Sequence, residues 1–154
     1  MVAPGVLLIM FEDLRKFRSG NARKTFRLIG HVLSQGIINS MRYRVYVIEL
    51  SKKVFTESAR FRAANPQFNG VLQCLYVGMT SKTPTERFKE HRTGYVNKKG
   101  HKLSSNIVLK YGTYLRPSLY EHINLKPMTR EEALIMEEKL AWDLRRQGYA
   151  VWFN

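Results

Sequence analysis

The stretch 75–91 constrains the fold of this chain most, because it reads as a strand, a short loop and a helix in direct succession. Tyr76 lies in a run of residues that favour a pleated strand, and Gly78 either ends this strand or lets another backbone come close. Thr83 and Glu86 then have the spacing of a capping box, which marks the first turn of a helix. The chain must therefore place a helix within a short loop of a strand, which favours folds that mix both elements.

Three side chains of this unit have the chemistry of a phosphate-binding site. Arg87 and His91 are four residues apart in the predicted helix 84–93, so they share one face of it. Tyr76 leaves the preceding strand on the same small unit. A guanidinium that is always charged, a titratable imidazole and a phenol together suit the binding of a phosphate group.

A second tyrosine strand is predicted over residues 43–50, where aromatic and β-branched residues dominate. Tyr46 lies on one face of this strand with Ile48 and Leu50. Taken alone, Tyr46 is best explained as a core or sheet-surface aromatic residue. Paired with Tyr76 on a neighbouring strand, it indicates a site that contains two tyrosines.

A buried carboxylate is predicted in the helix 130–147, whose start is marked by a second capping box, Thr129 and Glu132. Apolar residues recur in this helix with a period near 3.6, and Glu137 falls in the middle of their stripe. Its neighbour Glu138 falls on the polar face. A carboxylate that faces the core is costly unless it is paired or metal-bound. Glu137 is therefore a candidate metal ligand or the partner of a buried cation such as Arg87.

Taken in order, these residues resemble the signature of the GIY-YIG nuclease superfamily. Tyr76-Val77-Gly78 looks like the second half of that signature, and Val45-Tyr46-Val47 stands where the family has Gly-Ile-Tyr. The remaining matches are Arg87 to the family arginine, His91 to a histidine found in some branches, Glu137 to the metal-binding glutamate, and Asn154 to a late asparagine that helps hold the site. The resemblance covers roughly residues 43–154.

Two features differ from the usual pattern of that superfamily. Arg44 stands where a glycine is expected, and Tyr46 and Tyr76 are 30 residues apart instead of being joined by a short hairpin. The second difference predicts an enlarged hairpin, with a helical turn around residues 58–64. This segment is polar and basic, and a nucleic-acid arm and a solvated loop are equally good interpretations of it.

The predicted fold class is α/β in the α+β sense. The expected architecture is a small, mostly antiparallel three-stranded sheet flanked by helices, and the strand order is implied by the GIY-YIG resemblance. The expected strands lie near residues 43–50, 72–78 and 119–125, and the expected helices near 84–93, 105–111 and 130–147.

The charge of the chain indicates a polyanionic partner. Lys and Arg number 26 against 12 Asp and Glu, and residues 41–120 hold 15 basic but only 4 acidic side chains. The expected partner is nucleic acid, bound in a salt-sensitive manner, with DNA favoured over RNA. The candidate nucleic-acid-binding residues are Lys52, Lys53, Arg60, Arg62, Arg92, Lys98, Lys99, His101 and Lys102.

The chain is expected to contain one folded domain, residues 41–154, preceded by a basic extension. Residues 1–40 form this extension, which is predicted to be helical or poorly ordered. No run of about 18 or more apolar residues occurs, so no membrane span or membrane partner is expected. The expected location is intracellular, in the cytoplasm or nucleoid, and organellar targeting stays open.

The GIY-YIG resemblance implies a metal-dependent endonuclease that hydrolyses phosphodiester bonds. Glu137 would bind one Mg²⁺ or Mn²⁺ ion, and Arg87 would hold the scissile phosphate. Tyr46 would orient or deprotonate the attacking water, with His91 as a competing base and Tyr76 beside them. Gly78 and Asn154 would support the site. The alternative is a basic nucleic-acid-binding module without activity on the same scaffold.

Overall fold

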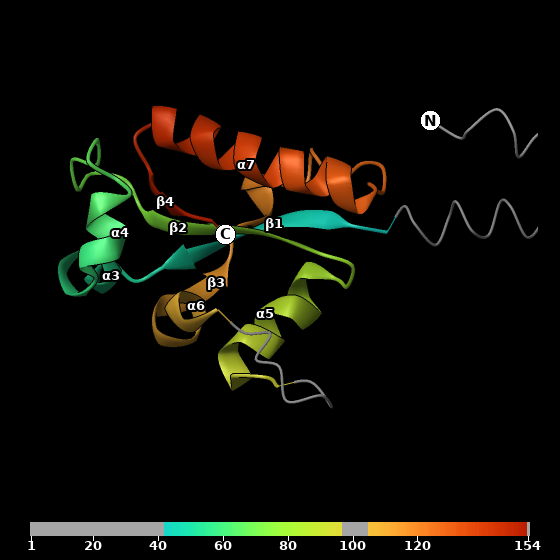
Figure 1. Ribbon diagram of the computed structural model, residues 1–154, viewed down its shortest axis with the longest axis horizontal. Coiled ribbons are helices and arrows are strands. Elements are labelled where there is room, and N and C mark those ends of the chain that lie inside the picture. Colours follow the sequence, from blue (N-terminus) through green and yellow to red (C-terminus); the bar gives the residue numbers. More distant parts are fainter. Residues whose placement is uncertain (1–41, 97–104, 154) are drawn as a thin grey trace, which may run out of the picture. The chain divides into compact units, whose positions relative to one another are not determined.

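The computed structural model describes residues 42–96 and 105–153 of the chain. Within them, Figure 1 shows a central sheet with α7 on one side and α5 and α6 on the other. The elements run in the order β1 (Arg44–Leu50), α3 (Lys53–Glu57), α4 (Ala59–Ala63), β2 (Cys74–Thr80), α5 (Pro84–Thr93), α6 (Asn106–Tyr111), β3 (Gly112–Leu115), η2 (Pro117–Leu119, a 3₁₀ turn), α7 (Arg130–Arg146) and β4 (Ala150–Trp152).

The sheet has four strands in the order β3-β1-β2-β4. β1 pairs antiparallel with β2 and with β3, whereas β4 pairs in parallel with β2. The predicted α+β class is confirmed, but the prediction of three strands was wrong in their number. β1 and β2 are central and almost wholly buried, because helices cover both faces of the sheet. The core is therefore built around the two strands that carry Tyr46 and Tyr76.

The predicted third strand at 119–125 was wrong. The strand that pairs with β1 on the side away from β2 is β3. Pro117 begins a 3₁₀ turn shortly after β3 ends. Proline has no N–H to give to a strand ladder, which favours the turn at this point. The side chain of Asn124 then pairs with the edge of β1: Val45 N–H donates to Asn124 Oδ1 at 3.1 Å, and Asn124 Nδ2 donates to Val45 O at 2.8 Å. A side-chain amide thus takes the place of the predicted strand.

The fourth strand, β4, comes from the apolar segment that follows α7. Its register places Cys74 opposite Ala150 and Tyr76 opposite Trp152. A parallel pair needs a long crossover connection, and α7 lies within that connection. Gly148, which directly precedes this segment, has a left-handed φ of +100° just past the helix, as its position in the sequence predicts.

The three predicted helices are confirmed as α5, α6 and α7. Both predicted capping boxes are present, at Thr83 with Glu86 and at Thr129 with Glu132. The enlarged hairpin contains α4 at the predicted helical turn and the additional short helix α3. None of the helices in the described part of the chain has both the length and the apolar character of a membrane span. The predicted extension at residues 1–40 lies outside the described residues.

Candidate functional site

The register of β1 and β2 brings the two tyrosines together on one face of the sheet. Tyr46 lies opposite Gly78, and Tyr76 lies opposite Ile48, so the two tyrosines are diagonal neighbours. Their ring centroids are 6.1 Å apart. This confirms that the tyrosines lie on adjacent strands, as their pairing in the sequence predicted.

Gly78 lies inside β2, and its missing side chain makes room for both phenols. A Cβ atom at this position would stand 2.6 Å from Tyr46 Oη and 2.8 Å from Tyr76 Cε1, closer than real Cβ contacts allow. Of the two roles predicted for Gly78, ending the strand was wrong, and the close approach is made by side chains and not by another backbone as predicted. The close approach is made by the phenol of Tyr46, which crosses the strand where Gly78 has no side chain.

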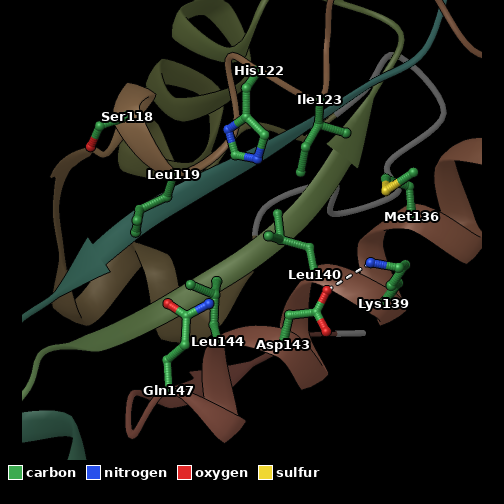
Figure 2. A pocket seen from close by; sticks show the side chains of 10 residues that line it. All are labelled: Ser118, Leu119, His122, Ile123, Met136, Lys139, Leu140, Asp143, Leu144 and Gln147. Atoms are coloured by element: carbon green, nitrogen blue, oxygen red, sulfur yellow. Dashed lines mark hydrogen bonds and ion pairs between the residues drawn. The ribbon is translucent and has the colours of Figure 1, made fainter.

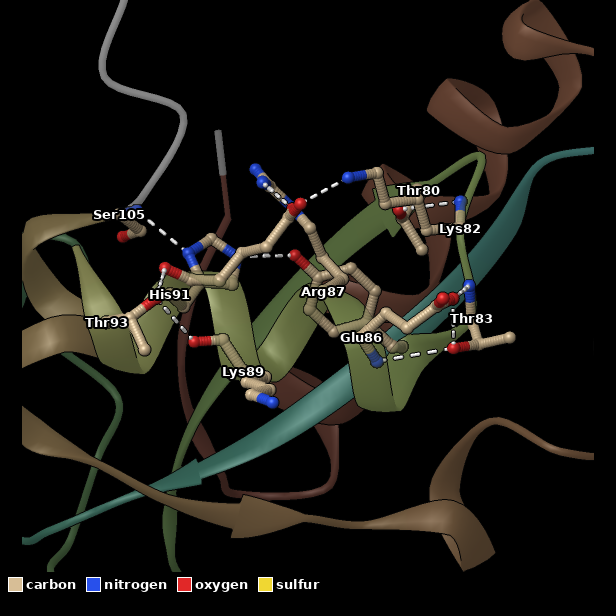
Figure 3. A network of polar contacts seen from close by, with 11 residues as sticks. Thr80, Lys82, Thr83, Glu86, Arg87, Lys89, His91, Thr93 and Ser105 are labelled. Atoms are coloured by element: carbon tan, nitrogen blue, oxygen red, sulfur yellow. Dashed lines mark hydrogen bonds and ion pairs between the residues drawn. The ribbon is translucent and has the colours of Figure 1, made fainter. Parts of the chain in front are cut away.

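Helix α5 supplies the groups that face the two phenols. His91 Nε2 lies 2.8 Å from Tyr46 Oη, and the edge of its ring meets Tyr76 at a centroid distance of 5.6 Å. The N–H of Ser105 donates to His91 Nδ1 at 2.8 Å (Figure 3). Tyr46, Tyr76 and His91 are each only 1% exposed. Both nitrogens of the imidazole thus have partners inside the protein.

Arg87 lies one helical turn before His91 and connects the phenols to a polar network. Its charge acts on the phenol of Tyr46, whose pKa it lowers, and its Nη1 donates to Glu90 Oε2 at 3.1 Å. Glu90 also forms an ion pair with Lys82, so one carboxylate lies between two cations (Figure 3). Sequence reasoning missed Glu90, although its position three residues after Arg87 on a helix was a usable signal.

The site is neutral apart from Arg87 and its ion-pair partners. Burial raises the pKa of Tyr46 well above its usual value, and nearby Tyr76 adds to this effect while Arg87 opposes it. Burial and the Arg87 charge lower the pKa of His91 to about 4. At neutral pH the cluster therefore consists of a protonated phenol and an uncharged imidazole beside a guanidinium.

Glu137 faces the sheet from α7, which lies on the opposite side of the sheet from α5 (Figure 1). Glu137 is 5% exposed, and the nearby buried positions of α7 are Ala133, Leu140 and Ala141. Glu138, by contrast, is exposed. The prediction that Glu137 points inward and Glu138 outward is confirmed. The carboxylate of Glu137 is thus held in the core, where it needs a polar or charged partner.

The residues of the described part can accommodate a single Mg²⁺ or Mn²⁺ only if the protein provides few of its ligands. In the ranges 42–96 and 105–153, no three His, Cys, Asp or Glu side chains gather into a metal-binding group. Mg²⁺ commonly keeps several waters and binds through one or two carboxylates together with substrate phosphate oxygens. The buried Glu137 fits this pattern.

Two of the predicted nucleic-acid-binding cations in the enlarged hairpin bind main-chain carbonyls instead. Lys52 Nζ donates to Gly70 O at 2.8 Å, and Arg62 Nη1 donates to Thr56 O at 2.6 Å. Both bonds close turns within the hairpin between β1 and β2. Two of the four cations that the nucleic-acid-arm interpretation relies on therefore make structural contacts within the hairpin.

The other predicted contact residues divide into three groups. Arg92 Nη1 donates to Gly112 O at 2.6 Å and so joins α5 to the start of β3. Arg60 lies over the ring of Trp152, 5.8 Å from its centroid, and Lys53 is exposed. The predicted residues Lys98, Lys99, His101, Lys102 and Asn154 lie outside the described residues.

A separate depression lies between α7 and the turn that follows η2 (Figure 2). His122 belongs to this turn and lines the depression. Lys139 and Asp143 on its opposite wall pair with each other at 2.8 Å. The residues of the tyrosine cluster do not line this depression, so it is a different place on the protein. Its lining residues are Ser118, Leu119, His122, Ile123, Met136, Lys139, Leu140, Asp143, Leu144 and Gln147.

Comparisons of the chain with protein-family models, with curated proteins and with solved structures found no match. The GIY-YIG resemblance therefore stays a prediction.

Proposed function

We propose that this protein is a metal-dependent endonuclease of the GIY-YIG type that hydrolyses phosphodiester bonds, with DNA as the favoured substrate. The observation that carries the proposal is the cluster in which Tyr46 is hydrogen-bonded to His91 and feels the charge of Arg87, with Tyr76 at its side. These groups come from two strands and a helix that are distant in sequence. On this proposal, β1, β2 and β3 form the three-stranded antiparallel sheet of the superfamily, and β4 is an added strand.

Arg87 would bind the scissile phosphodiester. A guanidinium offers two parallel N–H donors to a phosphate, and it stabilises the charge that develops on the phosphoryl oxygens. The Arg87 side chain is 20% exposed, and its contact with Glu90 sets the direction of the fork. Since the phenol and the imidazole are neutral at pH 7, no fixed negative charge on these two groups opposes an incoming phosphate.

On this proposal Glu137 holds the metal ion, with waters and phosphate oxygens as its other ligands, although its helix α7 covers the opposite side of the sheet from α5, which carries Arg87 and His91. When bound, the ion would neutralise phosphoryl charge and acidify a coordinated water. Tyr46 would orient the attacking water through its Oη, and Gly78 would keep that oxygen in place by leaving room for the ring. The proposed location is the cytoplasm or nucleoid, where such a substrate is found.

A nucleic-acid-binding module without activity is the second candidate function. The burial of Tyr46, Tyr76 and His91 favours it, because an attacking water needs access to the phenol oxygen. On this alternative, the cluster would be a hydrogen-bonded part of the core, and Glu137 would be one member of a structural pair. The two candidates make opposite predictions for cleavage.

The deciding experiment measures cleavage of supercoiled plasmid DNA and, separately, of a structured RNA, with Mg²⁺, Mn²⁺ or EDTA. Glu137→Gln is compared with Glu138→Gln, which changes the exposed neighbour on the same helix. We expect metal-dependent cleavage that falls by about 100-fold or more in Glu137→Gln and is retained in Glu138→Gln. Salt-sensitive binding without cleavage in any metal would overturn the nuclease proposal and support the binding module.

A further inference from the structure

The position of the ring proton on His91 follows from its two hydrogen bonds. Ser105 N–H donates to Nδ1 at 2.8 Å, and a main-chain N–H can act only as a donor. Nδ1 must therefore present its lone pair. In a neutral imidazole the one ring proton then lies on Nε2, which is the atom 2.8 Å from Tyr46 Oη.

We propose that His91 is a positioning residue and not the general base: its Nε2–H donates to Tyr46 Oη and holds that oxygen as an acceptor. This inference rests on the proposed nuclease function for its catalytic meaning. It removes His91 from the two bases that the sequence left open, because an Nε2 that already carries a proton cannot take one from Tyr46 or from water. His91 keeps its single ring proton throughout the reaction.

The burial of the imidazole supports this assignment. His91 is 1% exposed, and desolvation together with the Arg87 charge lowers its pKa to about 4, so the ring stays neutral at physiological pH. A doubly protonated ring is also excluded by geometry, because it would place a proton on Nδ1 against the N–H of Ser105. The donor assignment thus stands on the two contacts.

The arrangement gives Tyr46 Oη a donor, His91 Nε2–H, and exposes it to the charge of the Arg87 guanidinium. Hydrogen bonds donated to an oxygen stabilise its charged form more than its neutral form. The His91 donor and the Arg87 charge therefore oppose the rise in the Tyr46 pKa that burial causes, and Tyr46 keeps its own proton at neutral pH.

Ser105 is the residue that sets this arrangement. It occupies the N-cap position of α6, and its side chain makes no capping hydrogen bond. Its main-chain N–H points instead to His91 on α5, and the two helices pack together. The start of α6 thus determines which nitrogen of His91 faces Tyr46.

The first test is nitrogen NMR of the full-length protein labelled with ¹⁵N-histidine. The chain has four histidines, so the His91 signals are identified by their loss in His91→Gln. We expect a pyridine-type Nδ1 and a pyrrole-type Nε2 at pH 7. A pyridine-type Nε2 would overturn the proposal. This readout does not depend on nuclease activity, so it distinguishes failure of this inference from failure of the proposed function.

The second test compares cleavage by His91→Gln and His91→Leu. Gln keeps an N–H donor near the position of Nε2 but cannot act as a base, whereas Leu removes the donor. We expect Gln to retain kcat within about 10-fold of the wild type and Leu to lose about 100-fold. Equal loss in both variants, with thermal melting curves that show a folded protein, would mean that His91 is the base. If the wild type does not cleave, the NMR result alone decides the donor assignment.

Discussion

Helix α5 and the hairpin between β1 and β2 are both basic, but they use their cations in different ways. On α5, Arg87 meets side chains: the phenol of Tyr46 and the carboxylate of Glu90. In the hairpin, Lys52 and Arg62 donate to carbonyls of their own loop. A side-chain partner can be exchanged for a ligand at small structural cost, whereas a buried or loop-closing carbonyl that loses its donor destabilises the fold.

The hairpin is also tied to the rest of the domain by a buried amide. Asn65 is fully buried; its Nδ2 donates to Phe61 O at 2.9 Å, and its Oδ1 accepts from Val151 N–H at 2.6 Å. These bonds join α4 to β4 at one end of the sheet. The enlarged hairpin is therefore a packed part of the domain. Positive charge in a sequence does not distinguish such a segment from a binding surface.

The largest effect is expected when Arg87 of α5 and Arg62 of the hairpin are each replaced by alanine. Arg87→Ala should reduce cleavage by about 100- to 1,000-fold, because it removes the phosphate donor, with little change in melting temperature. Arg62→Ala should leave cleavage per folded molecule unchanged and lower stability by about 1 kcal/mol. Cleavage rates and urea unfolding of both variants measure this. Comparable loss of activity in both would remove the distinction between the regions.

Acidification should destabilise the α5 region through the protonation of His91, whereas the hairpin contains no histidine. The pKa of folded His91 is about 4, whereas an unfolded histidine titrates near 6.5. Between these values the unfolded chain binds more protons, so the free energy of unfolding should fall by roughly 3 kcal/mol as the pH drops from 6.5 to 4. Above pH 6.5 this contribution is constant. Urea unfolding at several pH values measures it, with His91→Gln reducing the slope and His122→Gln retaining it.

Replacing Gly78 and Gly70 by alanine should separate the cost of a steric overlap from the cost of a left-handed backbone conformation. Gly78→Ala should cost about 2 kcal/mol and displace Tyr46, because its Cβ would overlap the phenol. In Gly70→Ala, the Cβ would meet no atom of the described residues within 4 Å, so only the φ of +83° opposes it, at about 1 kcal/mol. Chemical denaturation compares the two costs. Equal stability of the variants would show that Tyr46 moves aside freely.

The smallest effect is expected from two adjacent lysines in the hairpin. Lys52→Ala should lower stability by about 0.5–1 kcal/mol, because it removes a donor to the carbonyls of residues 70 and 71, and should leave the salt dependence of DNA binding unchanged. Lys53→Ala should leave stability unchanged. If its exposed side chain contacts phosphate, this variant should reduce the slope of the salt dependence of binding by about 1. Binding titrations at several salt concentrations, with melting curves, test both. A reduced slope in Lys52→Ala would show that its loop contact is exchanged on binding.

Some of the candidate site could be predicted because its signals are short. The capping boxes at Thr83 and Thr129 each join residues three positions apart, and the period of α7 alone separates Glu137 from Glu138. Tyr46 and Tyr76 were predicted to be neighbours from two strand patterns, and the register confirms it. Glu90 and the N–H of Ser105 were missed: Glu90 had only a weak helical spacing signal, and a main-chain donor leaves no mark on residue type.

The sequence by itself determined the long helices, the two central strands and the inward direction of Glu137, because each depends on residues a few positions apart. The tertiary structure decided which segment completes the sheet, which lysines and arginines bind main-chain carbonyls, and which proton His91 carries. Those outcomes depend on partners that lie from 6 to 86 residues away along the chain. Their choice follows from packing, which determines which donor meets which acceptor.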